Sequence, residues 1–334
     1  MDGEQHAVVA RLGARGEHKK RITEKLTREL GPEVCTLLHD PSVIEIMLNP
    51  DGTLWVEHQG EPMRQFGRMS GSQAESLMAT VASTLKTQIT AHNPILECEL
   101  PLDGSRFEAL IPPVVSGPTF TIRKKALQVF SLADYVENGI MTTSQHDSIA
   151  SAVRHRKNIL VVGGTGTGKT TLTNAIIRHM VDVASEDRLA IIEDTGELQC
   201  SAENAVTMRA VEHVDMTRLL KATMRLRPDR IIVGEVRDGA ALALLKAWNT
   251  GHPGGVATIH ANSAPAGLIR MEQLVAEATQ ASMKMLIAEA IDLIISIEKV
   301  AGGRRVREVV TVEDHDGHKY VTKPIEEINY DNCS

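Results

Sequence analysis

The chain has 334 residues, which is long enough for two domains that each bury a core of their own. Charged residues make up 24% and hydrophobic residues 42%, an ordinary composition for a globular protein. The net charge of -7 and the 3% of aromatic residues argue against a surface that grips nucleic acid by basic grooves and base stacking, so we expect no strong direct binding of DNA.

Cysteine spacing and hydropathy exclude further classes of protein. The four cysteines are far apart and form no C-x-x-C pair, which predicts neither a zinc site nor a disulfide framework. The sequence lacks a signal-peptide core, and no apolar run approaches the ~20 residues that a membrane-spanning helix needs. We therefore expect a cytosolic protein.

The first part of the chain is predicted to be an α+β domain, residues 1–125. Residues 1 to about 40 become helical and are locally basic; a solvated helix face is the commoner reading, and contact with an anionic membrane the alternative. Alternating segments on either side of the Asp51-Gly52 turn predict a hairpin, and Ser72 with Glu75 resembles a capping box that opens a helix. Strands are expected at 43–48, 53–57, 95–100, 105–111 and 119–124, and the helix runs to about residue 85.

Residues 126–143 are predicted to connect this domain to a second one, residues 144–334. A short helix in the connector opens with Ser131-x-x-Asp134 and ends at Gly139. Beyond it, short apolar strands alternate with helices, which predicts a mostly parallel sheet covered on both faces, as in RecA-like α/β domains. Strands are expected at 158–162, 189–192, 230–233, 255–259, 293–298, 306–312 and 319–322, and helices at 144–154, 172–183, 216–226, 239–247 and 264–291.

A phosphate-binding loop follows the first strand of the second domain. The order strand, G-x-x-x-x-G-K-T, helix turns backbone N–H groups and a helix N-terminus toward an anion. Lys169 is expected to reach the β- and γ-phosphates of ATP, and the Thr170 hydroxyl to bind Mg²⁺. The predicted nucleotide-binding residues are Gly163, Gly164, Thr165, Gly166, Thr167, Gly168, Lys169, Thr170 and Thr171.

Acidic residues follow two further strands. Glu193 and Asp194 come directly after one, and Gly234 and Glu235 after another, where Glu235 replaces the aspartate usual in a Walker B strand. Because the carboxyl ends of parallel strands meet at one edge of a sheet, both should lie beside the phosphates. We assign Glu235 to the metal-bound water and Glu193 to polarising the attacking water, although the pattern leaves these two roles interchangeable.

A histidine ends a third strand at the same edge. A lone histidine usually has no role in function, but His260 follows a predicted sheet strand and is therefore expected near the γ-phosphate. It could sense that phosphate and couple hydrolysis to movement.

Taken together, four segments resemble one family, the secretion-superfamily hexameric ATPases, over residues 43 to 297. These segments are the P-loop, the acidic segment at Glu193 that resembles its "Asp box", the atypical Walker B at Glu235, and residues 250–260, which resemble its "His box". Chain length and the lack of a tetracysteine module favour the type IV secretion and conjugal transfer branch, with pilus-retraction ATPases as the main rival. The resemblance implies a homohexameric ATPase that uses ATP and Mg²⁺, works with other cytoplasmic and inner-membrane parts of a conjugative apparatus, and is peripheral to the inner membrane.

The resemblance also implies arginines that complete the site from the N-terminal domain. Arg123 is the first candidate and Arg106 the second, while Arg237 could act from the Walker B segment or across a subunit boundary. An ordinary surface ion pair is the alternative for an arginine on a strand.

Two functions of other classes compete with this reading. A RecA-like DNA motor would need a basic, aromatic groove. A nucleotide-operated binding switch would combine slow turnover with large changes in partner affinity.

Overall fold

The computed structural model of the chain describes residues 17, 20–125, 129–211 and 213–325. The chain divides into two compact units, Met1–Leu127 and Gln128–Ser334, and each is described by itself. Of the predicted basic helix, residues 20–30 are helical, and residues 1–16, 18 and 19 lie outside the described part. Among the helices that the structure describes, none combines the length and the apolar character needed to cross a bilayer.

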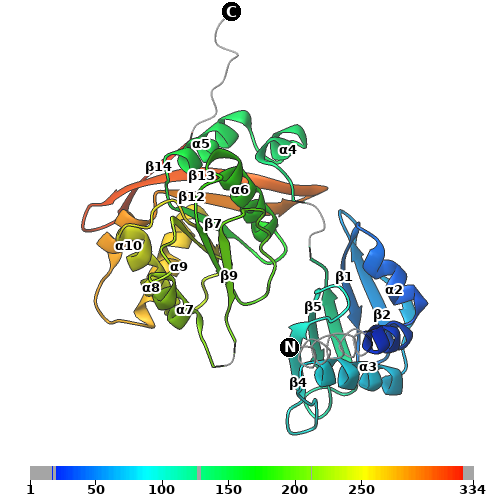
Figure 1. Cartoon of the computed structure of the whole chain (residues 1–334). Coiled ribbons are helices and arrows are strands. Elements are labelled where there is room, and N and C mark those ends of the chain that lie inside the picture. Colours follow the sequence, from blue (N-terminus) through cyan, green and yellow to red (C-terminus); the bar gives the residue numbers. More distant parts are fainter. Residues whose placement is uncertain (1–16, 18–19, 126–128, 212, 326–334) are drawn as a thin grey trace, which may run out of the picture. The chain divides into compact units, whose positions relative to one another are not determined.

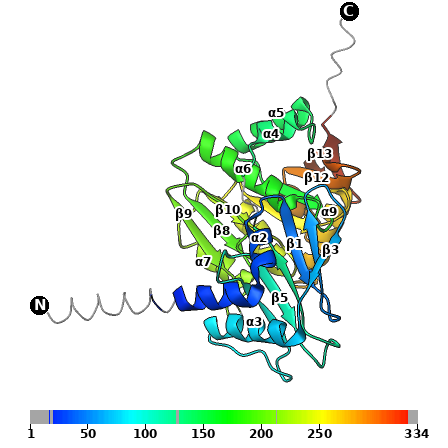
Figure 2. The same cartoon turned by 90° about the vertical axis from the view of Figure 1, so that its right-hand side faces the viewer.

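The first unit is a six-stranded antiparallel sheet with strand order β3-β2-β1-β6-β5-β4. Alternate residues of the strands, such as Ile46, Phe107 and Ile122, form one core with Leu77 and Met78 of a helix. The elements are α2 Pro32–His39, β1 Val43–Leu48, β2 Thr53–His58, β3 Arg64–Arg68, α3 Gly71–Thr84, β4 Ile95–Glu99, β5 Arg106–Leu110 and β6 Thr119–Arg123 (Figures 1 and 2).

The predicted hairpin and the predicted strands of this unit are confirmed, and one helix start is corrected. The α3 helix begins at Gly71, and its cap is Ser70, whose hydroxyl accepts the Gln73 N–H at 3.2 Å. The box at Ser72 and Glu75 was therefore placed two residues late, because an equivalent S-x-x-Q pattern precedes it. Strand β3 was missed, since its polar residues form an edge strand with no buried position.

The second unit is an eight-stranded sheet with strand order β14-β13-β12-β7-β11-β10-β8-β9. Six neighbouring strands, from β12 to β9, are parallel, and the two at the other edge are antiparallel, which confirms the predicted α/β class. The strands are β7 Ile159–Gly163, β8 Leu189–Glu193, β9 Ala205–Arg209, β10 Arg230–Val233, β11 Val256–His260, β12 Leu293–Val300, β13 Gly303–His315 and β14 Tyr320–Pro324.

Helices cover both faces of this sheet (Figure 1). On β7, Leu160 and Val162 face the core under α7 to α10, whereas Ile159 and Val161 face the core under α4 to α6. Burial on both sides explains why the strand reads as a continuous apolar run. The helices are α4 Leu132–Glu137, α5 Thr143–Arg154, α6 Lys169–Val183, α7 Met216–Thr223, α8 Ala240–Asn249, α9 Ala264–Ala276 and α10 Lys284–Ala290.

Three details of this unit differ from or add to the sequence-based expectation. The helix expected at 264–291 is two helices, and the irregular segment 277–283 separates them. Strand β9 was missed, since it is a half-exposed edge strand without an apolar run. Helix α4 has the predicted capping box of Ser131 and Asp134, and it buries Leu132 in the core of the second unit.

Candidate active site

The P-loop joins β7 to α6 in a conformation that its glycines allow. Gly166 and Gly168 have φ values of 70° and 96°, in the left-handed region. A Cβ at Gly163 would lie 2.5 Å from the Ile297 carbonyl oxygen, so no larger residue fits there. The first-turn N–H groups of a 15-residue helix begin directly after this loop. The loop therefore has the shape of an anion cradle.

The Lys169 ammonium lies inside this cradle and is buried. Its Nζ is 2.9 Å from the carbonyl oxygens of both Gly163 and Gly164, and 3.3 Å from His260 Nδ1. Burial lowers the pKa of Lys169, and the charge of Glu235 opposes that shift. The ammonium thus donates to loop carbonyls and to His260, and phosphate oxygens of a bound nucleotide could replace these acceptors.

His260 links Lys169 to the Walker B glutamate. A lysine ammonium can only donate, so Nδ1 of His260 accepts, and Nε2 carries the proton toward Glu235 Oε1 at 2.9 Å. Burial lowers the pKa of His260, and the charge of Lys169 lowers it further, in agreement with a neutral ring. The strand register brings His260 close to Lys169, because His260 on β11 pairs with Gly163 on β7, at the start of the P-loop.

Glu235 and Arg237 continue this row of polar contacts to the acidic segment after β8. Arg237 places one nitrogen 2.7 Å from Glu235 Oε2 and another 2.7 Å from Asp194 Oδ2. Burial raises the pKa of Glu235, but the hydrogen bond and charge of Arg237, with His260 and Lys169, outweigh it and leave the pKa lowered. Glu235 is therefore an ionised carboxylate at neutral pH.

Glu193 lies at the end of β8 and is 2% exposed. Its Oε2 accepts the Leu198 N–H at 3.0 Å. A Cβ at Gly234 would come within 3.0 Å of Glu193 Cβ, so a larger residue after the Walker B strand would crowd Glu193. The edge of the sheet thus brings Lys169, Glu193, Glu235, His260 and Arg237 into one unit, as their spacing predicts.

One residue of the site was missed by sequence reasoning. Glu197, four residues beyond Glu193, accepts the Thr170 hydroxyl through Oε2 at 3.2 Å. The same segment is held on α6 by Asn174, whose side chain contacts the Glu197 carbonyl and the Gln199 N–H. Only its place within the acidic segment could have signalled this role, because Glu197 follows no strand directly.

The two arginines predicted from the N-terminal domain lie side by side in the first unit. Arg106 on β5 and Arg123 on β6 are direct cross-strand partners and so share one face of the sheet. Arg123 Nε is 3.1 Å from Glu45 Oε1, an ion pair with the arginine side chain 42% exposed. Their contribution to a nucleotide site stays a prediction.

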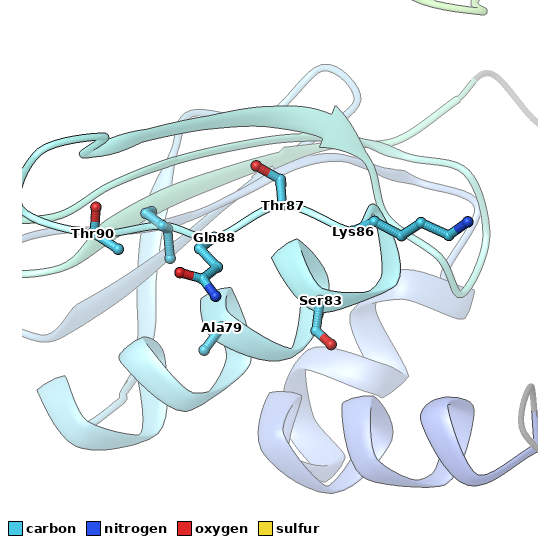
Figure 3. A pocket seen from close by; sticks show the side chains of 7 residues that line it. Ala79, Ser83, Lys86, Thr87, Gln88 and Thr90 are labelled. Carbon is cyan, nitrogen blue, oxygen red and sulfur yellow. The ribbon is translucent and has the colours of Figure 1, made fainter.

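A cavity of about 560 Å³ in the first unit has a different character (Figure 3). Ala79 and Ser83 of α3 line one side and residues 86–90 the other, and hydroxyl and amide groups predominate. Its lining holds one charged residue, Lys86, so none of the paired charges that phosphate chemistry needs gathers there.

The residues around Thr170 fit Mg²⁺ and a nucleotide. The ion prefers oxygen ligands and is usually held by one or two protein groups together with phosphates and water. Thr170 and Glu197 offer a hydroxyl and a carboxylate at the N-terminus of α6. Within the described residues, no cluster of three or more His, Cys, Asp or Glu side chains could hold a metal ion without other ligands.

Comparison with known proteins places the chain in a family. Residues 30–322 match the model of the Type II/IV secretion system protein family. The chain is 54% identical to the conjugal transfer protein TrbB of Rhizobium radiobacter over 93% of this chain and 96% of that protein. It is 31% identical to the type IV secretion system protein VirB11 of Bartonella henselae, over 83% and 90% of the two chains.

A solved structure agrees with the fold. The pilus retraction motor PilT with bound ADP superposes with a TM-score of 0.60 at 20% identity, over 89% of this chain and 83% of that one. The chain therefore belongs to the Type II/IV secretion system protein family, among the ATPases of type IV secretion and conjugal transfer that its motifs resemble.

Proposed function

We propose that the protein is a homohexameric ATP-hydrolysing motor of a conjugative type IV secretion system, which powers pilus assembly or substrate transfer. The observation that carries the proposal is the row of contacts from Lys169 through His260 and Glu235 to Arg237. It runs along the carboxyl ends of neighbouring parallel strands, beside a P-loop. The 54% identity to a conjugal transfer protein over nearly the whole chain favours that apparatus over pilus retraction.

In this proposal Lys169 leaves its loop carbonyls to bind the β- and γ-phosphates of ATP. Glu193, buried beside Gly234, orients and polarises the attacking water. His260 stands between Lys169 and Glu235, so a change at the γ-phosphate alters its contacts with both. Through these contacts, the neutral imidazole of His260 would couple ATP hydrolysis to movement in the rest of the subunit.

Mg²⁺, when bound with ATP, supplies charge neutralisation on the β- and γ-phosphates. Thr170 would hold it directly, and Glu235 through water. Arg237 stabilises developing negative charge from within the site or across a subunit boundary, and Arg123 and Arg106 do so from the first unit. A cytoplasmic location, peripheral to the inner membrane, belongs to the same proposal.

ATP hydrolysis and oligomeric mass test the proposal together. Wild-type protein is compared with Lys169→Ala by phosphate release, and light scattering gives the mass with Mg²⁺ and a non-hydrolysable analogue. We expect a mass near six subunits and turnover that falls by at least about a hundredfold in the variant, because the lysine charge on the transferring phosphoryl is lost.

Normal turnover by Lys169→Ala would contradict the proposed site. A monomer with slow turnover and large nucleotide-dependent changes in partner affinity would favour a binding switch. Tight DNA binding at physiological salt, with many-fold stimulation of turnover, would favour a DNA motor.

A further inference from the structure

We propose that Glu197 is a metal-site residue of this ATPase: it positions the Thr170 hydroxyl for Mg²⁺ and joins the metal site to the glutamate that polarises water. This inference rests on the proposed function, since it concerns the same nucleotide site. It starts from the Thr170 hydroxyl, which donates to Glu197 Oε2 at 3.2 Å.

The direction of that hydrogen bond determines what Thr170 can do. A hydroxyl that donates its proton to a carboxylate turns its lone pairs away from it, and the carboxylate makes the oxygen a stronger ligand. Thr170 is the second residue of α6, so these lone pairs lie at the helix N-terminus, where the P-loop ends. The Glu197 carboxylate thereby orients the Thr170 hydroxyl as a metal ligand.

Glu235 is engaged elsewhere. Its Oε1 contacts His260 Nε2 at 2.9 Å, and its Oε2 contacts Arg237 Nη2 at 2.7 Å. Both oxygens of the Walker B glutamate thus have cationic or polar partners away from Thr170. Glu197 is the carboxylate that the hydrogen bonds of the described residues assign to the Thr170 hydroxyl.

The position of Glu197 is fixed by a buried amide. Asn174 is 1% exposed and lies one helical turn beyond Thr170 on α6, so the two side chains share a face. Its Nδ2 donates to the Glu197 carbonyl at 3.2 Å, and its Oδ1 accepts the Gln199 N–H at 2.9 Å. A segment without regular structure is thereby held against the helix that carries the metal ligand.

The same segment reaches the water-polarising residue. Leu198, the next residue, donates its N–H to Glu193 Oε2 at 3.0 Å. A shift of Glu197 upon metal binding would therefore move the N–H that orients Glu193. The charge of Glu197 also belongs to the site: burial lowers the pKa of Lys169, and the charges of Glu235 and Glu197 both oppose that shift.

Metal affinity is the measurement that isolates this role. Mn²⁺ replaces Mg²⁺ as the probe, and its affinity for the full chain with bound ADP is measured by electron paramagnetic resonance. Glu197→Gln keeps the shape and an oxygen acceptor but loses the charge, so we expect Mn²⁺ to bind at least about tenfold more weakly, as for other residues that orient metal ligands. Affinity for ADP in the presence of EDTA should change far less than the Mn²⁺ affinity, because the Glu197 carboxylate accepts from the Thr170 hydroxyl and its loss leaves the backbone N–H groups of the P-loop in place.

Two further variants control for structure. Glu203→Gln removes an exposed carboxylate of the same loop and should leave Mn²⁺ affinity unchanged. Glu197→Asp keeps the charge on a shorter side chain and should recover part of the affinity. If circular dichroism shows that Glu197→Gln does not fold, the Mn²⁺ affinity of Glu197→Asp is compared with that of the wild type instead, and an unchanged affinity would contradict the metal role.

The outcomes separate this inference from the proposed function. Wild-type Mn²⁺ affinity in Glu197→Gln, or a lower unfolding temperature with no change of metal affinity, would overturn the metal role and leave the ATPase intact. If the wild-type protein binds ADP no more tightly with Mn²⁺ than with EDTA, the proposed nucleotide site itself fails.

Discussion

At the scale of single residues, the site is a chain of hydrogen bonds in which each group sets the state of the next. Lys169 donates to His260, which must then be neutral and donate to Glu235, which is ionised beside Arg237. Removing one member changes the protonation or the position of its neighbours. Effects of substitutions along this chain should therefore not be additive.

Acid should weaken the fold through His260. Its pKa lies below the ordinary value of about 6.5, so the unfolded chain takes up this proton first as the pH falls. The stability that neutral His260 contributes to the fold is fully present above the ordinary pKa. It is lost as the pH falls from that value through the lowered pKa of the folded protein. We expect wild-type protein to lose more thermal stability between pH 7.5 and 5.5 than His260→Gln, by a small margin because the side chain is 45% exposed.

Thermal unfolding followed by circular dichroism at the two pH values measures this difference. His39→Gln, an exposed histidine of the first unit, is the control and should behave as the wild type. An equal loss in wild type and His260→Gln would contradict the expected coupling.

At the scale of elements, the amino ends of the parallel strands are joined by a buried ion pair. Arg230, the first residue of β10, contacts Asp187 just before β8 at 2.6 Å, and the two side chains are 1% and 3% exposed. The guanidinium also donates to the carbonyls of Val153, in the last turn of α5, and of Gly254 before β11. One arginine thus ties three segments together beneath the site.

Asp187→Ala would leave the Arg230 charge buried without its carboxylate. We expect a loss of ~3–5 kcal/mol in the free energy of unfolding, the usual effect of breaking a buried pair from one side. Urea denaturation of the full chain measures it. Glu298→Ala breaks the exposed pair with Arg305 and should cost no more than about 1 kcal/mol, and equal losses in the two variants would contradict the argument.

At the scale of the whole molecule, the chain consists of two units with separate cores, and the proposed chemistry needs both. The second unit carries the P-loop, Glu193, Glu235 and His260, and the first carries Arg106 and Arg123 on adjacent strands. If arginines of the first unit act on the γ-phosphate, as proposed, hydrolysis would depend on residues of that unit as well as on the P-loop.

Arg123→Ala tests this dependence. We expect kcat to fall by at least about tenfold, since an arginine on the transferring phosphoryl contributes far more than that in related chemistry. Binding of a fluorescent ADP analogue should change by less than about threefold, because the P-loop is intact. Steady-state hydrolysis and fluorescence titration give the two quantities.

Glu45→Ala is the matched control for Arg123. It breaks the 3.1 Å ion pair and keeps the arginine. If Arg123 serves only that pair, both variants should lose the same activity. A loss confined to Arg123→Ala supports the role in hydrolysis.

The sequence by itself determined the class of fold, most strand positions and the residues at the edge of the second sheet. Continuous apolar runs in β7, β8 and β10 are forced by burial on both faces, and the residue after each run must then lie at one edge. Together with the P-loop motif that follows β7 and the strand that ends at His260, that rule locates Lys169, Glu193, Glu235 and His260 at this edge without a structure. The family followed from the same four segments.

Only the tertiary structure decided which of these groups contact one another. The role of Glu197 depends on how an irregular segment folds back onto α6, and no periodicity encodes that path. Likewise, edge strands β3 and β9 carry little apolar pattern because one of their sides remains open. Local pattern reports burial, whereas hydrogen bonds between distant segments depend on the completed fold, and for this reason the neutral tautomer of His260 was visible only there.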